Sequence, residues 1–298
     1  MPQILEGVPV RTQILNNLKP RVARIGRPPG LAVILVGDDA ASGQYVRNKI
    51  RACAELGVYS EKLTPPASTT TDELLKVIDA LNRRPEIDAI LVQMPLPPHI
   101  DSRKVLEAVA PDKDADGFHP VNVGHLVAGR PAPRACTPAG IIELLKYYRI
   151  PIDGRKAVVV GRSDIVGKPM ALMLLAENAT VTICHSRTAN LPEECRAADI
   201  LVAAIGKPAL ITADFIAPGA TVVDVGVSRI SDAAEAERLG KAEDFARHGT
   251  AWVGDVHPVG VRRVAAAYSP VPGGVGPLTI AMLMTNTVSL AERHLGVS

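Results

Sequence analysis

Two side chains that could do chemistry stand four residues apart in the segment "SGQYVRNKIRACAELG", residues 42–57. Its apolar residues recur at helical spacing, which predicts an amphipathic helix. On such a helix Tyr45 and Lys49 share one face. An aromatic ring can stack on a flat ligand and an ammonium group can move a proton, although a solvated helix face would also explain the pair.

Two further polar residues stand where open α/β sheets bind ligands. The segment "ILVQMPLPP" (90–98) places Gln93 at the carboxyl end of a predicted strand, which the following prolines stop. Asp116 lies in segment 110–138, which is rich in Asp, Pro and Gly and predicts a crossing or active-site loop. Taken singly, Gln93 could be a turn cap and Asp116 a loop or helix cap.

A third feature is the strand–turn–helix pattern "KAVVVGRSDIVGKPMALMLL" (156–175). Its glycines, Gly161 and Gly167, depart from the G-x-G-x-x-G fingerprint, so the motif alone is weak. Its context is stronger, because a glycine turn between a strand and a helix lets backbone N–H groups hold phosphate. We therefore favour a nucleotide site over a plain βα turn.

The residues after the next predicted strand indicate which nucleotide binds. NAD sites use an acid about 20 residues past the glycine turn, whereas here the strand ends in "CHSRT" without one. Arg162, Ser186 and Arg187 offer donors for a 2′-phosphate instead. The sequence therefore favours NADP, and the missing acid carries more weight than any single arginine.

The elements that must position these residues alternate along the chain. We predict strands at 31–36, 58–63, 87–92, 156–160, 180–184, 199–204 and 221–225. Helices are predicted at 41–56, 71–83, 138–149, 166–178, 190–197 and 279–294. Such alternation indicates right-handed βαβ units and parallel sheets, hence an α/β fold.

Composition excludes several classes of protein. A net charge of +2 without long basic runs gives no reason to expect nucleic acid as a partner. The apolar runs are too short to span a bilayer, and four scattered cysteines favour a reduced, cytoplasmic protein.

"DKDADG" (112–117) opens like a calcium loop, but Val123 stands where the bidentate Glu belongs. The histidines lack metal-ligand spacing, so no metal is expected.

Longer motifs change the interpretation. "SGQYVRNK", "VQMPLP", "PDKDADGFHPVNVGHL", "CTPAGI", "VVVGRSDIVGKPM", "VTICHSRT", "VVDVGV", "GDV" and "PVPGGVGPLTIAMLMTNT" follow one another in the order of one family. Over nearly its whole length the chain resembles bifunctional methylenetetrahydrofolate dehydrogenase/methenyltetrahydrofolate cyclohydrolase. The resemblance implies a folate-binding catalytic domain at 1–138, to which helix 277–298 returns, and a Rossmann-like NADP-binding domain at 139–276.

The resemblance also implies roles for individual residues. The family's catalytic lysine maps to Lys49, its stacking tyrosine to Tyr45, its glutamine to Gln93 and its pterin-binding aspartate to Asp116. The loop that closes over the folate is implied to contribute Pro270, Pro272, Gly273 and Gly276. The implied NADP contacts are Gly161, Arg162, Ser163, Ser186 and Val227.

The implied reactions suit these residue types. Oxidation of 5,10-methylene-tetrahydrofolate moves a hydride to the nicotinamide and needs mainly positioning. Hydrolysis of the resulting methenyl cation needs a titratable group, for which Lys49 is the candidate. The family is also implied to form homodimers. Two alternatives stay open: an NADP-dependent amino- or hydroxy-acid dehydrogenase, and an NADP-binding regulatory module without catalysis.

Overall fold

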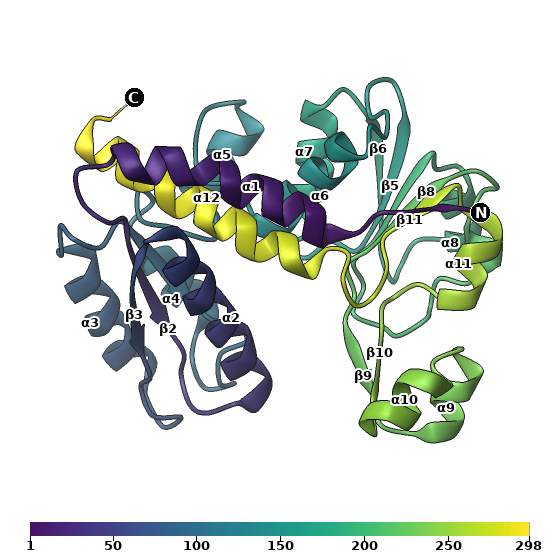
Figure 1. The fold of residues 1–298 in the computed structure, drawn as a ribbon, viewed down its shortest axis with the longest axis horizontal. Helices are drawn as coiled ribbons and strands as arrows, with labels where there is room; N and C mark the ends of the chain where they lie inside the picture. The colour runs from purple at the N-terminus through teal and green to yellow at the C-terminus, as the bar shows by residue number, and fades with distance from the viewer. Residues whose placement is uncertain (298) are drawn as a thin grey trace. The chain divides into compact units, whose positions relative to one another are not determined.

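The computed structural model describes residues 1–297. The chain divides into two compact units, each with its own sheet. The three-stranded unit holds Arg11–Cys136 and the residues from Ile280 on, and the six-stranded unit holds Met1–Val10 and Thr137–Thr279. Figure 1 follows the chain through both by colour.

The three-stranded unit is built on a parallel sheet of strand order β3-β2-β4. Its strands are β2 (Gly30–Ile34), β3 (Tyr59–Leu63) and β4 (Ala89–Val92). β2 and β4 are buried along their whole length, as their near-continuous apolar sequences require. Successive residues of β2 point to opposite faces, so Leu31 enters one core cluster and Ala32 another.

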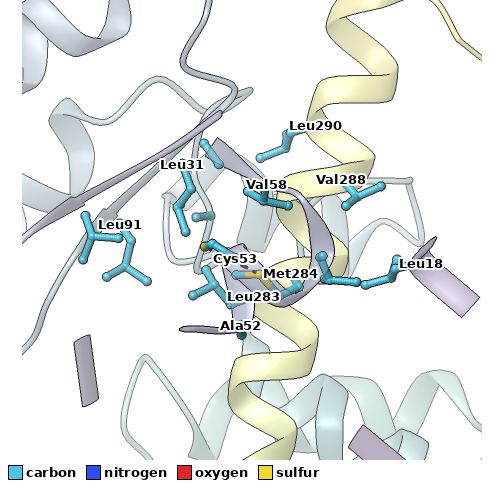
Figure 2. Packing of buried hydrophobic residues seen from close by; sticks show 14 of the residues in the cluster. Leu18, Leu31, Ala52, Cys53, Val58, Leu91, Leu283, Met284, Val288 and Leu290 are labelled. Atoms are coloured by element: carbon cyan, nitrogen blue, oxygen red, sulfur yellow. Dashed lines mark hydrogen bonds between the residues drawn. The ribbon is translucent and has the colours of Figure 1, made fainter. Parts of the chain in front are cut away.

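Helices cover both faces of this sheet. α1 (Gly7–Arg24), α2 (Ala40–Leu56) and α12 (Gly276–Leu295) contribute to the core cluster on one face. α3 (Thr71–Asn82) and α4 (Ser102–Ala108) contribute to the cluster on the other, and α5 (Pro120–Val127) belongs to the same unit. Within the unit α1 runs beside α12 (Figure 1), and Arg21 pairs with Glu292 at 2.6 Å. Figure 2 shows Met284 of α12 among the core side chains, with its sulfur 3.8 Å from that of Cys53 on α2.

The six-stranded unit contains a parallel sheet of order β1-β11-β8-β7-β5-β6. The strands are β1 (Gln3–Ile4), β5 (Lys156–Val160), β6 (Thr180–Cys184), β7 (Ile200–Ala203), β8 (Thr221–Asp224) and β11 (Ala267–Tyr268). From β5 the chain adds β6 on one side of it and then returns to add β7 on the other, so the strand order reverses between β5 and β7. In open α/β sheets, ligands bind at the carboxyl ends of the strands at such a switch point.

Two sets of helices enclose this larger sheet. α6 (Cys136–Tyr147) and α7 (Gly167–Ala176) contribute to one core cluster. α8 (Leu191–Arg196), the short helix η1 (Ala213–Phe215) and α11 (Pro258–Val264) contribute to the other. An antiparallel hairpin of β9 (Ser228–Ile230) and β10 (Ala251–Val253) encloses α9 (Ala233–Arg238) and α10 (Ala242–His248).

The α/β class, the parallel sheets and the return of the C-terminal helix to the first part of the chain are confirmed. Segment 110–138 is not loop throughout, because Pro120 and the capping side chain of His119 start α5. The prediction also missed α1, α4, α9, α10 and α11. No helix in residues 1–297 is long and apolar enough to cross a membrane.

Candidate active site

Lys49 and Gln93 meet at the carboxyl edge of the three-stranded sheet. Asp39 caps the start of α2 by accepting from the N–H of Ser42 at 2.7 Å, and the helix then presents Lys49, which is only 8% exposed. The ammonium donates to Oε1 of Gln93 at 3.0 Å. The Gln93 N–H continues the ladder of β4 by donating to Ile34 O at 2.8 Å. The sheet therefore fixes the backbone of Gln93, and its side-chain amide is held by donating Nε2–H to Met94 O at 2.6 Å.

Tyr45 lies one turn before Lys49 on α2, and 48% of it is exposed. Its ring is therefore accessible to a flat ligand, whereas the ammonium of Lys49 is withdrawn into the protein. The two side chains that the sequence paired thus differ in environment, which suits a stacking surface and a proton-handling group.

Asp116 reaches the same edge by another route. Residues just before it run parallel to β4, as Ala115 N donates to Ile90 O at 3.2 Å and Ile90 N to Lys113 O at 2.7 Å. Burial raises the pKa of the Asp116 carboxyl to about 6, although the positive charge of Lys49 opposes the rise. At neutral pH this half-buried carboxylate is ionised and accepts hydrogen bonds.

Asp114 shapes the loop that carries Asp116. Its buried carboxylate accepts from the N–H groups of Gly117 at 3.0 Å and His119 at 2.8 Å, and from Nδ2 of Asn122 at 2.9 Å. The Asp-rich sequence that resembles a calcium loop therefore binds its own backbone. In residues 1–297 no group of three or more His, Cys, Asp or Glu side chains could hold a metal ion.

The glycine turn of the six-stranded unit has the close packing that a dinucleotide requires. Gly161 follows β5 with φ +133°, and a Cβ there would lie 2.1 Å from the carbonyl oxygen of Ala204. The hydroxyl of Ser163 accepts from the N–H groups of Val166 and Gly167, each at 3.2 Å. Gly167 starts α7, so the turn leads into a helix N-terminus that can hold phosphate.

Donors for a 2′-phosphate stand on neighbouring strand ends. Val160 of β5 pairs with Cys184 of β6, which brings Arg162 and the "HSRT" turn to one edge of the sheet. That turn is closed by His185 N donating to Thr188 Oγ1 at 2.8 Å. The side chains of Arg162, Ser186 and Arg187 are all exposed. The residues present therefore fit NADP.

Val227 and the predicted folate loop also belong to the six-stranded unit. Val227 follows β8 and is 47% exposed. The loop contains Pro270, Pro272, Gly273 and Gly276, the last of which begins α12. Gly274 N donates to Pro270 O, and Gly7 N donates to Gly273 O, both at 2.8 Å. Its backbone is thus closed on itself and tied to the first residues of the chain.

Sequence reasoning missed two buried carboxylates that organise this edge. Asp255 accepts from three successive N–H groups of residues 205–207, at 2.5, 3.0 and 2.8 Å. Asp224 accepts in turn from the N–H groups of Asp255 and Val256 at 2.8 and 2.9 Å, and burial raises its pKa to about 7. The available signal was an acid at the end of each apolar run, in "VVDVG" and "VGDV".

Two family profiles match the chain. "Tetrahydrofolate dehydrogenase/cyclohydrolase, catalytic domain" matches residues 5–116, and the NAD(P)-binding domain of the same name matches residues 135–295. The chain belongs to the tetrahydrofolate dehydrogenase/cyclohydrolase family.

Individual relatives cover the chain from end to end. It is 61% identical to the bifunctional protein FolD of Solibacter usitatus over the full length of both, and 55% identical to that of Koribacter versatilis over 98% of both. Among solved structures it is similar to the bifunctional FolD of Campylobacter jejuni, with 40% identity, a TM-score of 0.90, and coverage of 99% of this chain and 100% of that one. FolD of Trypanosoma brucei, solved with NADP cofactor and an inhibitor, gives 38% identity, a TM-score of 0.88, and coverage of 98% and 99%.

Membership of the tetrahydrofolate dehydrogenase/cyclohydrolase family confirms the resemblance predicted from the motifs. It supports NADP as the cofactor, and it does not favour the amino- or hydroxy-acid dehydrogenase alternative. The catalytic-domain profile spans Tyr45, Lys49, Gln93 and Asp116, and the NAD(P)-binding profile spans the glycine turn and the 270–276 loop. The role of each of these residues remains a prediction.

Proposed function

We propose that this chain oxidises 5,10-methylene-tetrahydrofolate to 5,10-methenyl-tetrahydrofolate with NADP and then hydrolyses the product to 10-formyl-tetrahydrofolate. The observation that carries the proposal is the buried ammonium of Lys49 held by Gln93 at 3.0 Å, in a chain of the tetrahydrofolate dehydrogenase/cyclohydrolase family. A lysine withdrawn from solvent and oriented by a neutral amide can handle a proton from a fixed position.

In the first reaction the chain's residues bind and orient the folate. Tyr45 stacks on the flat ring system, and the carboxylate of Asp116 accepts the paired N–H donors of the pterin. When bound, NADP would supply the acceptor for the hydride, with its electron pair, that leaves the bridging carbon as the substrate becomes a cation. Since no proton moves in this step, positioning is the main contribution that the protein makes.

In the second reaction water adds to the cationic carbon and one carbon–nitrogen bond of the ring breaks. Acting as the free amine, Lys49 takes one proton from the attacking water and returns it to the ring nitrogen that leaves the carbon. The second proton, from the hydroxyl that becomes the formyl oxygen, is released to solvent. Gln93 keeps Nζ of Lys49 in place, between the attacking water and the departing ring nitrogen, without adding charge. Proton transfer by a positioned group typically accelerates a reaction by about 10²- to 10⁴-fold.

The six-stranded unit is the proposed cofactor side. Gly161, Arg162, Ser163, Ser186 and Val227 contact NADP, and Pro270, Pro272, Gly273 and Gly276 close over the folate. In domain terms, residues 1–138 with helix 277–298 supply the catalytic groups and residues 139–276 bind NADP. Arg162 and Ser186 are both exposed, and each stands two residues beyond the paired strand ends Val160 and Cys184, which supports preference for a 2′-phosphate.

We also infer a cytoplasmic homodimer. The four cysteines, Cys53, Cys136, Cys184 and Cys195, are free and buried, which suits a reducing compartment. Light scattering of the purified chain at micromolar concentration tests the dimer, since a monomeric mass would rule it out.

The proposed reactions are tested by absorbance. Purified protein is mixed with methylene-tetrahydrofolate and either NADP or NAD, and the methenyl product is followed as it forms and decays. We expect formation with NADP to be faster than with NAD, followed by decay faster than in buffer. Absence of any methenyl signal with either nucleotide would refute the dehydrogenase, and decay at the buffer rate would refute the cyclohydrolase.

A further inference from the structure

The hairpin of β9 and β10 carries an unusual connection. Segment 231–250 forms α9 and α10 where a hairpin loop commonly has about two to five residues. Ile230, Ala236, Leu239, Ala251 and Val253 form a small buried cluster that joins the two helices to the hairpin. The insert is therefore a packed platform attached to β9 and β10.

Lys241 projects from this platform to the predicted folate loop. Only 11% of its side chain is exposed, and its Nζ donates to the carbonyl oxygen of Val271 at 3.0 Å. The same ammonium lies 3.3 Å from Asp244, whose side chain is half exposed. A hydrogen bond from a charged donor that is largely withdrawn from water is stronger than an exposed one.

The contact with Val271 falls between two points at which main-chain hydrogen bonds hold the loop to other parts of the unit. Main-chain hydrogen bonds hold the loop at Ser269, to Val222 O at 3.0 Å, and at Gly273, to Gly7 N at 2.8 Å. Between these two points a cavity of about 150 Å³ lies against the loop, lined by residues that include Lys241, Asp224, Pro270, Val271 and Pro272. Lys241 lines this cavity and bonds to Val271 O, so it restricts the loop at a point where a cavity lies against the backbone.

We propose that Lys241 is a positioning residue that holds the Pro270–Gly276 loop in the conformation that receives the folate. The inference rests on the proposed function in one respect, namely that this loop contacts the substrate. Lys241 touches neither substrate nor cofactor in this role. It lowers the cost of ordering the loop upon folate binding, which is an effect on binding and not on the chemical step.

Lys241→Met tests the proposal because it keeps the length of the side chain and removes the donor. We expect KM for methylene-tetrahydrofolate to rise about fivefold to tenfold, while kcat and KM for NADP change by less than about twofold. Lys241→Arg, which can still donate to Val271 O, should restore most of the affinity for folate. A thermal unfolding curve of each variant checks that the platform remains folded.

Two control variants separate loop positioning from other effects. Arg247→Met removes a cation from the same insert, where it is 71% exposed and pairs only at 3.7 Å with Glu243, and should leave both KM values unchanged. Asp244→Asn removes the ion pair but not the bond to Val271. An unchanged folate KM in Lys241→Met, an equal rise of both KM values, or reproduction of the effect by Asp244→Asn would overturn the proposal. Wild-type turnover is measured first, so failure of the proposed function is recognised separately.

Discussion

The two units place their functional groups in opposite environments. In the three-stranded unit Lys49 is 8% exposed and its partner Gln93 is fixed by the ladder of β4. In the six-stranded unit the predicted phosphate donors Arg162 and Ser186 are exposed, and what is buried is the backbone of the glycine turn. A group that moves protons must be positioned and partly desolvated before the substrate arrives. Groups that recognise a charged ligand can remain solvated and mobile until they meet it.

The largest effect is expected on the buried side. Lys49→Met should reduce hydrolysis of methenyl-tetrahydrofolate by at least about a hundredfold, since it removes the proton-handling group and leaves its shape. Folate binding should change little. Arg51→Met, a substitution at an exposed position of the same helix, is the control. Undiminished hydrolysis in the Lys49 variant would refute its assignment as the proton-handling group of the three-stranded unit.

Asp116 should give the next largest effect and a characteristic pH profile. Because its pKa is raised to about 6, the carboxylate gains a proton as the pH falls below that value and loses capacity to accept. We therefore expect kcat/KM for the folate to fall about tenfold per pH unit below pH 6 and to level off above it. Asp116→Asn should lower kcat/KM by about tenfold to a hundredfold and abolish the bend. A bend that persists in this variant would assign the titration to another group.

The contrast in burial extends to ion pairs that serve only stability. Asp88 is fully buried in the three-stranded unit, where Arg27 at 2.7 Å, His294 at 3.1 Å and the N–H of Gly30 at 2.8 Å all contact its carboxylate. Asp88→Asn should lower the free energy of unfolding by about 2 kcal/mol, measured by urea denaturation. Substitution of Lys168, which forms an exposed ion pair with Asp164, should change the free energy of unfolding by less than about 0.5 kcal/mol.

The pH dependence of that stability follows from the same burial. Burial of Asp88 acts to raise its pKa, but the hydrogen bonds from Arg27, Gly30 and His294 together with the charge of Arg27 outweigh it, so the pKa is lowered in the folded protein. Its contribution is therefore present above the unfolded value, near ~3.9, and is lost as the pH falls through the depressed folded value. Wild type and Asp88→Asn should converge in stability in strong acid, and a constant difference between them at all pH values would contradict the assignment.

Among the functional residues of the two units, the smallest effect is expected on the exposed side. Arg162→Ala should raise KM for NADP by about tenfold and leave KM for the folate unchanged, because it removes one of several solvated donors. The matched control is Arg155→Ala, which replaces an exposed arginine that directly precedes β5, at the end of the strand opposite to Arg162. Equal increases of both KM values in the Arg162 variant would contradict its assignment to the 2′-phosphate.

The sequence predicted the elements whose own pattern determines them. The buried parallel strands appear as continuous apolar runs, and α3 begins at the capping box of Thr70 and Glu73. The short elements were missed because their stability comes from tertiary contacts. β1 has only two residues, both exposed, and forms by pairing with β11. α9 and α10 depend on a cluster of small apolar residues that no single segment displays.

The candidate site divides in the same way. Lys49, Gln93 and Asp116 were predictable as residues from their places at strand and helix ends and from the family motifs. The contact of Lys49 with Gln93, and the bonds made by Asp224 and Asp255, were not predictable because each joins residues distant in sequence. The bonds of Asp114 are local, to residues 117–122, but the sequence did not show that this carboxylate accepts from them. Acids in a loop or at a strand end do not reveal in advance whether they bind a ligand or their own backbone.

The grouping of Met1–Val10 and of the residues from Ile280 on has a consequence for how the protein is made. Each unit is built from two separate stretches of the chain, since β1 needs β11 and the core around Cys53 needs Met284. A ribosome that has released only the first two hundred residues has therefore delivered neither unit in finished form. The six-stranded unit is complete only when β11 has been made, and the three-stranded unit only when α12 has been made. Nascent chains therefore expose apolar surface for longer than those of an enzyme built from consecutive domains.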